Sequence, residues 1–285
     1  MSPQTLVCLV AACGGISPRL ATRSFVHLAG LVVGFLACAG LGSVRANAEE
    51  GFKPLFNGRD LSGWKVVVDK KGVVEEQSIF SVVDGMMHVY PNAAEGSVQP
   101  FAGLVTDVAY LNYHLRLQFR WGTRKFAPRA DAVRDAGVMF HLHGEPVIWP
   151  QSVEFQIQEG DCGDLWVIGA TRASTPMHSL SNGYDFNGDL RTLGDGMAAG
   201  LRAPRGAFWE TPGWNTVEVI VRGADAVFLM NGKQVNEARH MRWKKPGAGD
   251  WGWQPLTEGP IMLQAEGAEL FYRAIEFRPL PATDR

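Results

Sequence analysis

Acidic, imidazole and amide side chains recur at every second position in three short segments of the chain. They are His141, His143, Glu154, Gln156, Gln264 and Glu266. Alternate residues of an extended strand face the same side, so the polar groups of each segment share a face. Carboxylates and imidazoles can transfer protons, and amides can orient a ligand through hydrogen bonds. The pattern predicts either a binding face or the wet face of an antiparallel sheet.

Arginine and tryptophan side chains could complete such a face. Arg120 lies on the polar side of residues 113–121, and Trp166 follows the segment that holds Glu154. Planar hydrogen-bonding groups prevail on these polar sides, and such groups suit bidentate contact with sugar hydroxyls. A flat aromatic ring can also stack on the C–H face of a sugar. We therefore expect Arg120, Gln156, Trp166, Gln264 and Glu266 to bind substrate, with Glu154 as a base or a metal ligand.

The two histidines also allow a metal site. His141 and His143 share a face, and Glu154 or Asp161 could supply a third ligand to a divalent ion. No other cofactor is indicated. Residues 185–196 begin like a calcium loop but carry Gly at positions four and twelve, so the EF-hand pattern fails. The sequence has no P-loop, no dinucleotide fingerprint and no Gly-x-Ser-x-Gly elbow.

Short strand-like runs separated by Gly, Pro, Asn and Asp dominate the chain after residue 50. Asp84-Gly85 has the composition of a tight hairpin turn. Expected strands are 64–69, 79–83, 86–90, 103–106, 113–121, 136–143, 153–158, 164–169, 215–222, 226–230, 261–265 and 270–277. This pattern predicts an all-β antiparallel sandwich or jelly roll, formed as one domain by residues 49–285. Residues 171–213 are rich in Gly, Ser, Asn, Asp and Pro, and we expect a long loop over the site.

The first 48 residues differ in composition from the rest. They contain three Arg and no acidic residue, and no charged side chain occurs from Ser24 to Val44. Ala46-Asn47-Ala48 fits a signal peptidase site. We expect a signal peptide that is cleaved after Ala48, export to the periplasm or the extracellular space, and no stable membrane insertion afterwards. An uncleaved anchor and a lipoprotein lipidated at Cys38 are the alternatives.

The remaining residues exclude several classes of protein. Residues 49–285 contain 24 basic and 29 acidic side chains, a net charge of −5, which argues against a nucleic-acid binder. Cys162 is the only cysteine there, which excludes an internal disulfide and a thiolate zinc cluster. An apolar content of 46% excludes a disordered chain. Nothing in the sequence identifies a protein partner.

Residues 51–64, with the sequence GFKPLFNGRDLSGW, resemble the opening signature of the 3-keto-disaccharide hydrolase family. Further blocks similar to the family follow in the same order, and the resemblance extends to about Leu280. These blocks are residues 113–120, 136–141, 153–158, 213–216, 229–233, 259–267 and 271–275.

This resemblance implies a concanavalin-like jelly roll, export and action on carbohydrate. Family members are associated with cleaving glycosides whose sugar carries a ketone at C3, which acidifies the C2 proton. Such chemistry needs a base near C2, an electrophile at the C3 oxygen and an acid at the leaving oxygen. Glu154 and Gln156 match the family's central pair. His141 stands where many members have Arg, and Glu266 where many have His, so the substrate or a metal site could differ.

The sequence therefore predicts an exported enzyme that acts on 3-keto-glycosides, with Glu154, His141, His143 and Asp161 as candidate catalytic residues. A metal site would use His141, His143 and Glu154. The same fold also serves non-catalytic, lectin-like glycan-binding modules, and fold alone does not decide function. A structural cell-surface protein is a third hypothesis, which would leave the polar face open.

Overall fold

The chain is described by a computed structural model that covers residues 51–74, 78–245 and 247–281. The predicted signal peptide and its cleavage site lie outside the described residues. Within these ranges the regular secondary structure consists of β-strands and one 3-10 turn, η1 (Asp250–Gly252). No helix in the described ranges is long and apolar enough to cross a membrane.

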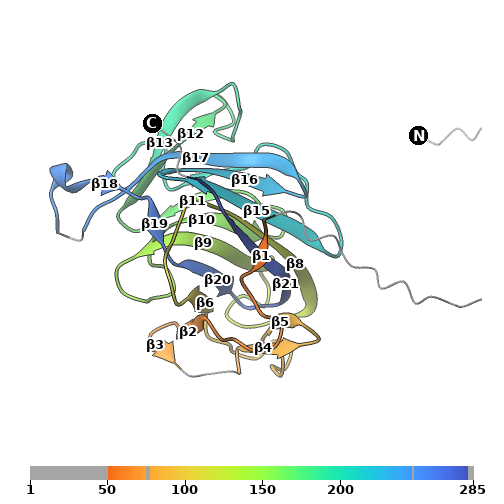
Figure 1. Cartoon of the computed structure of the whole chain (residues 1–285). Helices are drawn as coiled ribbons and strands as arrows, with labels where there is room; N and C mark the ends of the chain where they lie inside the picture. Colours follow the sequence, from red (N-terminus) through yellow and green to blue (C-terminus); the bar gives the residue numbers. More distant parts are fainter. Residues whose placement is uncertain (1–50, 75–77, 246, 282–285) are drawn as a thin grey trace, which may run out of the picture. The chain divides into compact units, whose positions relative to one another are not determined.

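Two antiparallel sheets form the two layers of the molecule (Figure 1). The first sheet has the order β13 (Asp189–Gly194), β12 (Thr171–Met177), β17 (Lys233–Trp243), β16 (Asp225–Met230), β15 (Asn215–Arg222), β8 (Tyr113–Lys125), β21 (Ala268–Pro279), β5 (Met86–Val89), β4 (Phe80–Val83). Beside this path, β1 (Lys53–Pro54) pairs with β21 and β18 (Gln254–Pro255) pairs with β17.

The second sheet carries the candidate site. Its order is β14 (Arg202–Ala203), β11 (Leu165–Ile168), β10 (Gln151–Gln158), β9 (Asp135–His143), β20 (Ile261–Ala265), β6 (Ala102–Thr106), β2 (Trp64–Val68), β3 (Gly72–Val74). A separate pair of short strands joins β19 (Glu258–Gly259) to β7 (Tyr110–Leu111). The predicted all-β antiparallel sandwich of the jelly-roll type is confirmed.

The main hydrophobic core lies between the two sheets. Alternate residues of β8, including Leu117 and Phe119, are buried from one side, and Val153 and Phe155 of β10 are buried from the other. Phe155 meets Phe228 of β16 with ring centroids 5.1 Å apart. Each fully buried side chain of this size stabilises the fold by roughly 1.5–3 kcal/mol. The alternation leaves every second residue of both sheets facing outward.

A smaller apolar cluster covers part of the outer face of the second sheet. It consists of Val67, Val105, Met139, Ile148 and Met262. Four of these residues come from strands of the sheet, whereas Ile148 comes from residues 144–150, which connect β9 to β10. We call residues 144–150 the cover segment, because Ile148 holds it against this face.

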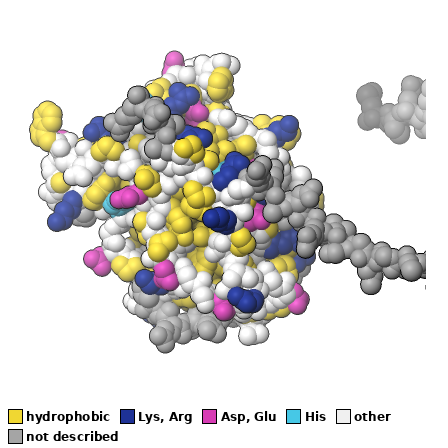
Figure 2. All heavy atoms as spheres, in the orientation of Figure 1, with side chains coloured by type: hydrophobic (Ala, Val, Ile, Leu, Met, Phe, Trp, Pro, Cys, Tyr) yellow, Lys and Arg dark blue, Asp and Glu magenta, His cyan; other side chains and the backbone are white. Residues whose placement is uncertain are grey.

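The turn predicted at Asp84-Gly85 is present, and both residues have positive φ angles, 51° and 76°. This geometry matches a hairpin turn of type I′. On the face of the molecule seen in Figure 2, basic and acidic side chains are interspersed with apolar ones.

The prediction of a long loop at residues 171–213 is wrong for much of this range. Thr171–Met177 and Asp189–Gly194 form β12 and β13, which pair with each other, and β12 extends the first sheet beyond β17. β13 is the edge strand of the sheet and β12 lies next to it, and β12 contains Pro176. A polar composition with proline is typical of loops, which explains the error.

Candidate active site

The outer face of the second sheet brings together polar residues from β9, β10, β11 and β20. Glu154 of β10 lies directly opposite Trp166 of β11 on one side and Met139 of β9 on the other. One row further along, Gln156 lies opposite Gly137, and Gln264 of β20 lies opposite Gly103 of β6. The sheet register therefore fixes Glu154, Gln156, Trp166 and Gln264 on one face.

Gly137 lies beneath the point where two of these side chains meet. A Cβ atom at Gly137 would lie 1.9 Å from Oε1 of Glu154 and 2.1 Å from Oε1 of Gln264. The carboxyl and the amide therefore lean over Gly137 from β10 and β20 into the same space. Any residue larger than glycine would collide with both groups, so the absence of a side chain at position 137 allows them to converge.

Glu154 and Gln264 are both buried, and the amide of Gln264 lacks hydrogen-bond partners. Glu154 is 5% exposed and Gln264 is fully buried. Both polar atoms of the Gln264 amide, Oε1 and Nε2, lack a hydrogen-bond partner among the described residues. A buried amide without partners is costly, because it has lost its hydrogen bonds to water. This arrangement is typical of a site where a ligand supplies the missing partners.

A second acidic group adjoins this pair at the start of β9. Asp135 accepts a hydrogen bond from Nε2 of Gln156 at 2.9 Å, and its other oxygen pairs with Nη2 of Arg129 at 2.6 Å. Arg129 comes from residues 126–134, which connect β8 to β9. Arg129 therefore neutralises one carboxylate of the site and holds Gln156 indirectly through Asp135.

The cover segment supplies an aromatic side chain to the third acidic group. Nε1 of Trp149 donates a hydrogen bond to Oε1 of Glu266 at 3.2 Å, and the Trp149 ring meets Phe101 edge-on at 5.6 Å. Glu266 follows β20 directly and is 8% exposed, whereas Trp149 is 45% exposed. Trp149 thus connects the buried carboxyl to the protein surface.

Burial raises the pKa of all three carboxyl groups. Burial raises the pKa of Glu154 well above its ordinary value, and the charges of Glu266 and Asp135 add to this effect. Burial raises the pKa of Glu266 to about 7, helped by Asp135 and opposed by the Trp149 hydrogen bond and by Arg129. Burial also raises the pKa of Asp135 to about 6, against the charge of Arg129. Glu154 therefore holds its proton more tightly than an ordinary carboxyl group, and Glu266 is close to half ionised at neutral pH.

The two predicted histidines lie away from this cluster. His141 has a φ angle of 54° and sits where the pairing of β9 with β10 shifts register. This bulge breaks the alternation, and the buried imidazole meets Tyr113 of the first sheet at 6.0 Å. Burial lowers the pKa of His141 to about 3. His143 packs on Trp243 of β17 at 4.3 Å between ring centroids.

The predicted metal-ligand set is not assembled. Among the residues that the structure describes, no group of three His, Cys, Asp or Glu side chains is arranged to hold a metal ion. His141 faces Tyr113, whereas Glu154 faces the opposite side of the second sheet. No reaction step is therefore assigned to a metal held by His141, His143 and Glu154.

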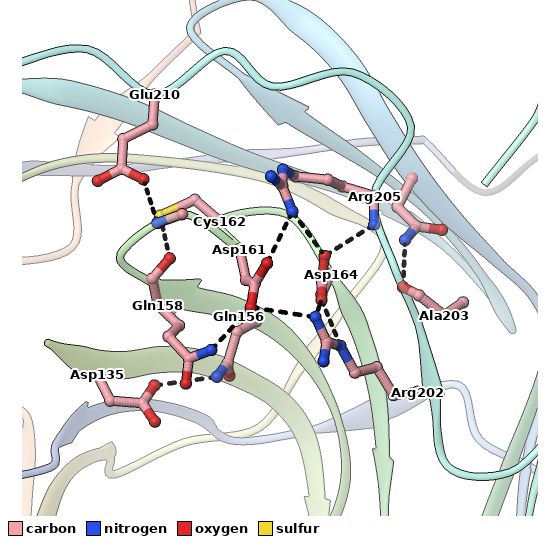
Figure 3. A network of polar contacts seen from close by, with 12 residues as sticks. Asp135, Gln156, Gln158, Asp161, Cys162, Asp164, Arg202, Ala203, Arg205 and Glu210 are labelled. Atoms are coloured by element: carbon pink, nitrogen blue, oxygen red, sulfur yellow. Dashed lines mark hydrogen bonds and ion pairs between the residues drawn. The ribbon is translucent and has the colours of Figure 1, made fainter. Parts of the chain in front are cut away.

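Asp161 belongs to an ion-pair network at the turn between β10 and β11 (Figure 3). Its carboxylate pairs with Arg205 at 3.0 Å and with Arg202 at 3.1 Å, and it accepts a hydrogen bond from Gln158 at 2.9 Å. Both arginines also contact Asp164. These contacts occupy Asp161 and fix the turn that follows Gln156, so Asp161 has a positioning role.

Arg120 lies on the other outer face of the sandwich. Its guanidinium packs on Phe271 at 4.8 Å and on Trp214 at 5.2 Å, both measured to the ring centroid. Phe119 of the same strand points into the core, so Arg120 points outward from the first sheet. It therefore does not meet Glu154, which faces outward from the second sheet.

Sequence reasoning missed Asp135, Arg129 and Gly137 and did not place Trp149 beside Glu266. Asp135 starts a strand and Arg129 lies in a connection, so neither belongs to an alternating polar pattern. Gly137 precedes Val138 in an apolar strand, where a glycine suggests close approach of another group. That signal could have identified Gly137.

Comparisons with known proteins find solved structures and one sequence family that are similar to this chain. A comparison with curated proteins finds no match. A crystal structure from Parabacteroides distasonis described as a "putative glycosyl hydrolase" shares 20% identity, over 80% of this chain and 99% of that chain, with a TM-score of 0.47. A second one from the same organism shares 18% identity, over 81% and 95%, with a TM-score of 0.47. The carbohydrate binding module CBM66 from Bacillus subtilis shares 8%, over 76% and 95%, with a TM-score of 0.45.

The sequence model described as the 3-keto-alpha-glucoside-1,2-lyase-like domain matches residues 51–278. This range contains all three carboxyl groups of the site and both sheets. The chain therefore belongs to the 3-keto-alpha-glucoside-1,2-lyase-like domain family, and its function is related to carbohydrate.

Proposed function

We propose that this protein is an exported enzyme that cleaves the glycosidic bond of sugars oxidised to a ketone at C3. The observation that carries the proposal is the convergence of the buried Glu154 carboxyl and the unpartnered Gln264 amide above Gly137, with the buried Glu266 carboxyl near enough to act on Glu154 through its charge. Carboxyl groups with strongly raised pKa values are typical of acid–base sites. Export follows from the predicted signal peptide.

In this proposal the two glutamates divide the proton transfers. Glu266, with a pKa of about 7, removes the proton from C2 of the sugar, because a base works best with a pKa near the working pH. The electron pair of that C–H bond forms an enolate with the C3 ketone. Nε2 of Gln264 donates a hydrogen bond to the enolate oxygen.

Collapse of the enolate then breaks the bond between C1 and the leaving oxygen. A double bond forms between C1 and C2, the C3 ketone is restored, and neutral Glu154 protonates the leaving oxygen. Addition of water across the new double bond would complete a hydrolysis. In this proposal the base role expected for Glu154 from sequence passes to Glu266, since burial raises the pKa of Glu154 well above its ordinary value and favours its protonated form.

The remaining residues of the face bind and orient the sugar. Trp166 lies beside Glu154 and offers an aromatic surface, and Trp149 adds a second one from the cover segment. Gln156 is held by Asp135, so the direction of its amide is fixed. Closure by the cover segment keeps water away from the enolate, which strengthens the hydrogen bond from Gln264.

The decisive experiment compares the wild-type chain with Glu154→Gln on a panel of 3-keto-glycosides, each with and without EDTA. Glutamine keeps the shape but cannot donate a proton to the leaving oxygen, so turnover should fall by about 10²–10⁴-fold. Glu258→Gln, at an exposed position on β19, is the matched control and should keep normal turnover. Loss with EDTA alone would bring a metal into the reaction.

Two results would contradict the proposal. Near-normal turnover by Glu154→Gln would remove this residue from the mechanism. Wild-type protein that binds the sugars but turns over no member of the panel would support the alternative, a non-catalytic lectin-like module. Binding is measured by calorimetry on the same samples, so that inactive protein and misfolded protein can be told apart.

A further inference from the structure

The outer face of the first sheet carries two arginines in direct opposition. Arg172 of β12 is the cross-strand partner of Arg242 of β17. Like charges at directly opposite positions of an antiparallel pair destabilise the pair. The residues from 49 to the C-terminus carry a net charge of −5, so this concentration of positive charge is local.

Backbone carbonyls, and not carboxylates, satisfy these two arginines. Nε and Nη2 of Arg172 donate to the carbonyl oxygen of Asp195 at 3.0 and 2.6 Å. Nη2 of Arg242 donates to the carbonyl oxygen of Trp253 at 3.2 Å. The Asp195 carboxylate pairs with Lys244 at 2.9 Å. Within the described ranges, neither Arg172 nor Arg242 forms a salt bridge, and the Asp195 carboxylate acts on Arg172 only through its charge, so the two positive charges are only partly compensated.

The two arginines line a hollow of about 400 Å³ together with Ser174, Thr192, His240 and Trp253. The hydroxyls of Ser174 and Thr192 lie 2.9 Å apart and can turn toward a ligand. The Trp253 ring holds the Arg172 guanidinium at 4.1 Å and the Lys244 ammonium at 4.9 Å from its centroid. No Asp or Glu side chain lines this hollow.

We propose that this hollow is a second ligand site, which binds an oxyanion carried by a glycan, either a sulfate ester or a uronate carboxylate. Guanidinium groups bind such oxyanions through paired hydrogen bonds. The hydroxyls of Ser174 and Thr192 offer further donors. A bound anion would relieve the repulsion between Arg172 and Arg242, so ligand binding and local stability are coupled. The site is independent of the Glu154 cluster, which lies on the second sheet.

The test measures binding of four ligands to the full-length chain by calorimetry at low and high salt. The ligands are a sulfated oligosaccharide, its unsulfated counterpart, a uronate oligosaccharide and inorganic sulfate. We expect the anionic sugars to bind, binding to weaken with salt, and the unsulfated counterpart to bind at least tenfold more weakly. Binding by inorganic sulfate as tight as by the sulfated sugar would overturn the glycan part of the proposal.

Arg172→Gln and Arg242→Gln should each weaken anionic-glycan binding by about tenfold or more, because each removes a charge-assisted hydrogen-bond donor. Arg222→Gln removes an exposed charge from β15 of the same sheet and should bind normally. Arg242 is exposed, so its variant should fold even if Arg172→Gln does not; circular dichroism checks both. The proposed site would be overturned if Arg222→Gln lost as much glycan binding as the other two variants, or if Arg242→Gln bound the anionic glycan normally. Equally tight binding of single-stranded DNA would overturn the assignment of a glycan as the ligand. Glu154→Gln should leave this binding unchanged.

Discussion

Replacing Gly137 by alanine tests whether the shared space above this residue assembles the active site. The added Cβ atom would lie 1.9 Å from Oε1 of Glu154 and 2.1 Å from Oε1 of Gln264. Since non-bonded heavy atoms need roughly 3–4 Å, each group must retreat by about 1 Å or more. The backbone of Gly137 does not have a positive φ angle, so alanine adds this contact without backbone strain.

The displacement should affect activity more than stability. A shift of about 1 Å in a reacting group costs about 10²-fold in rate, so we expect kcat on a 3-keto-glycoside to fall by that factor. Overpacking typically costs about 1–3 kcal/mol, which lowers the melting temperature of a domain of this size by about 2–12 °C. Steady-state kinetics and thermal unfolding measure the two effects separately.

Gly103→Ala is the matched control, because Gly103 lies on the same face on the far side of Gln264. Its new Cβ atom would lie 2.6 Å from Sδ of Met262, a flexible thioether that can move aside. The control should show a similar loss of stability with near-normal turnover. The proposed convergence would be refuted if Gly137→Ala turned over substrate within a factor of about 3 of wild type. It would also be refuted if Gly137→Ala and Gly103→Ala lost turnover to the same extent.

Three further predictions concern Glu266. Turnover should rise with pH through about 7 as Glu266 ionises, and Glu266→Gln should abolish both turnover and this rise. Because the pKa of Glu266 rises from 4.5 to about 7 on folding, the folded state binds its proton more tightly, and stability should fall as pH increases across that interval. Melting temperatures of wild type and Glu266→Gln check this, and parallel curves would contradict it. Trp149→Phe removes the hydrogen bond that lowers the pKa of Glu266, so the rise in turnover should move to higher pH. An unchanged pH profile would show that the indole does not influence Glu266.

Alternation within strands correctly predicted the shared face of the central site residues, because β10 and β20 are regular where these residues lie. Glu154 and Gln156 occupy the outward positions of β10, and Gln264 occupies the matching positions of β20. The same rule misplaced His141, because a bulge with positive φ reverses the direction of the following side chains. Bulges leave little trace in composition, so the pattern could not reveal this one.

The position of Arg120 depends on a property of the sandwich that alternation along one strand does not contain. Alternation shows which residues of a strand face outward, but a sandwich has two outer faces and the pattern does not distinguish them. Arg120 therefore looked equivalent to Gln156, although the two residues point away from opposite sheets. Asp135 and Arg129 were missed for another reason, since their ion pair depends on how a connection folds back over the sheet.

The cover segment has a consequence for how tightly any ligand can bind. Ile148 is 2% exposed within the small apolar cluster on the outer face of the second sheet. Returning such a side chain to water costs roughly 1.5–3 kcal/mol. A substrate that enters only when Ile148 lifts away sees an accessible form populated at about 1–10% of molecules, and its measured dissociation constant rises in the same proportion. For such a substrate, the hydrophobic contact of Ile148 lowers the measured affinity of a site whose proton transfers are made by polar groups.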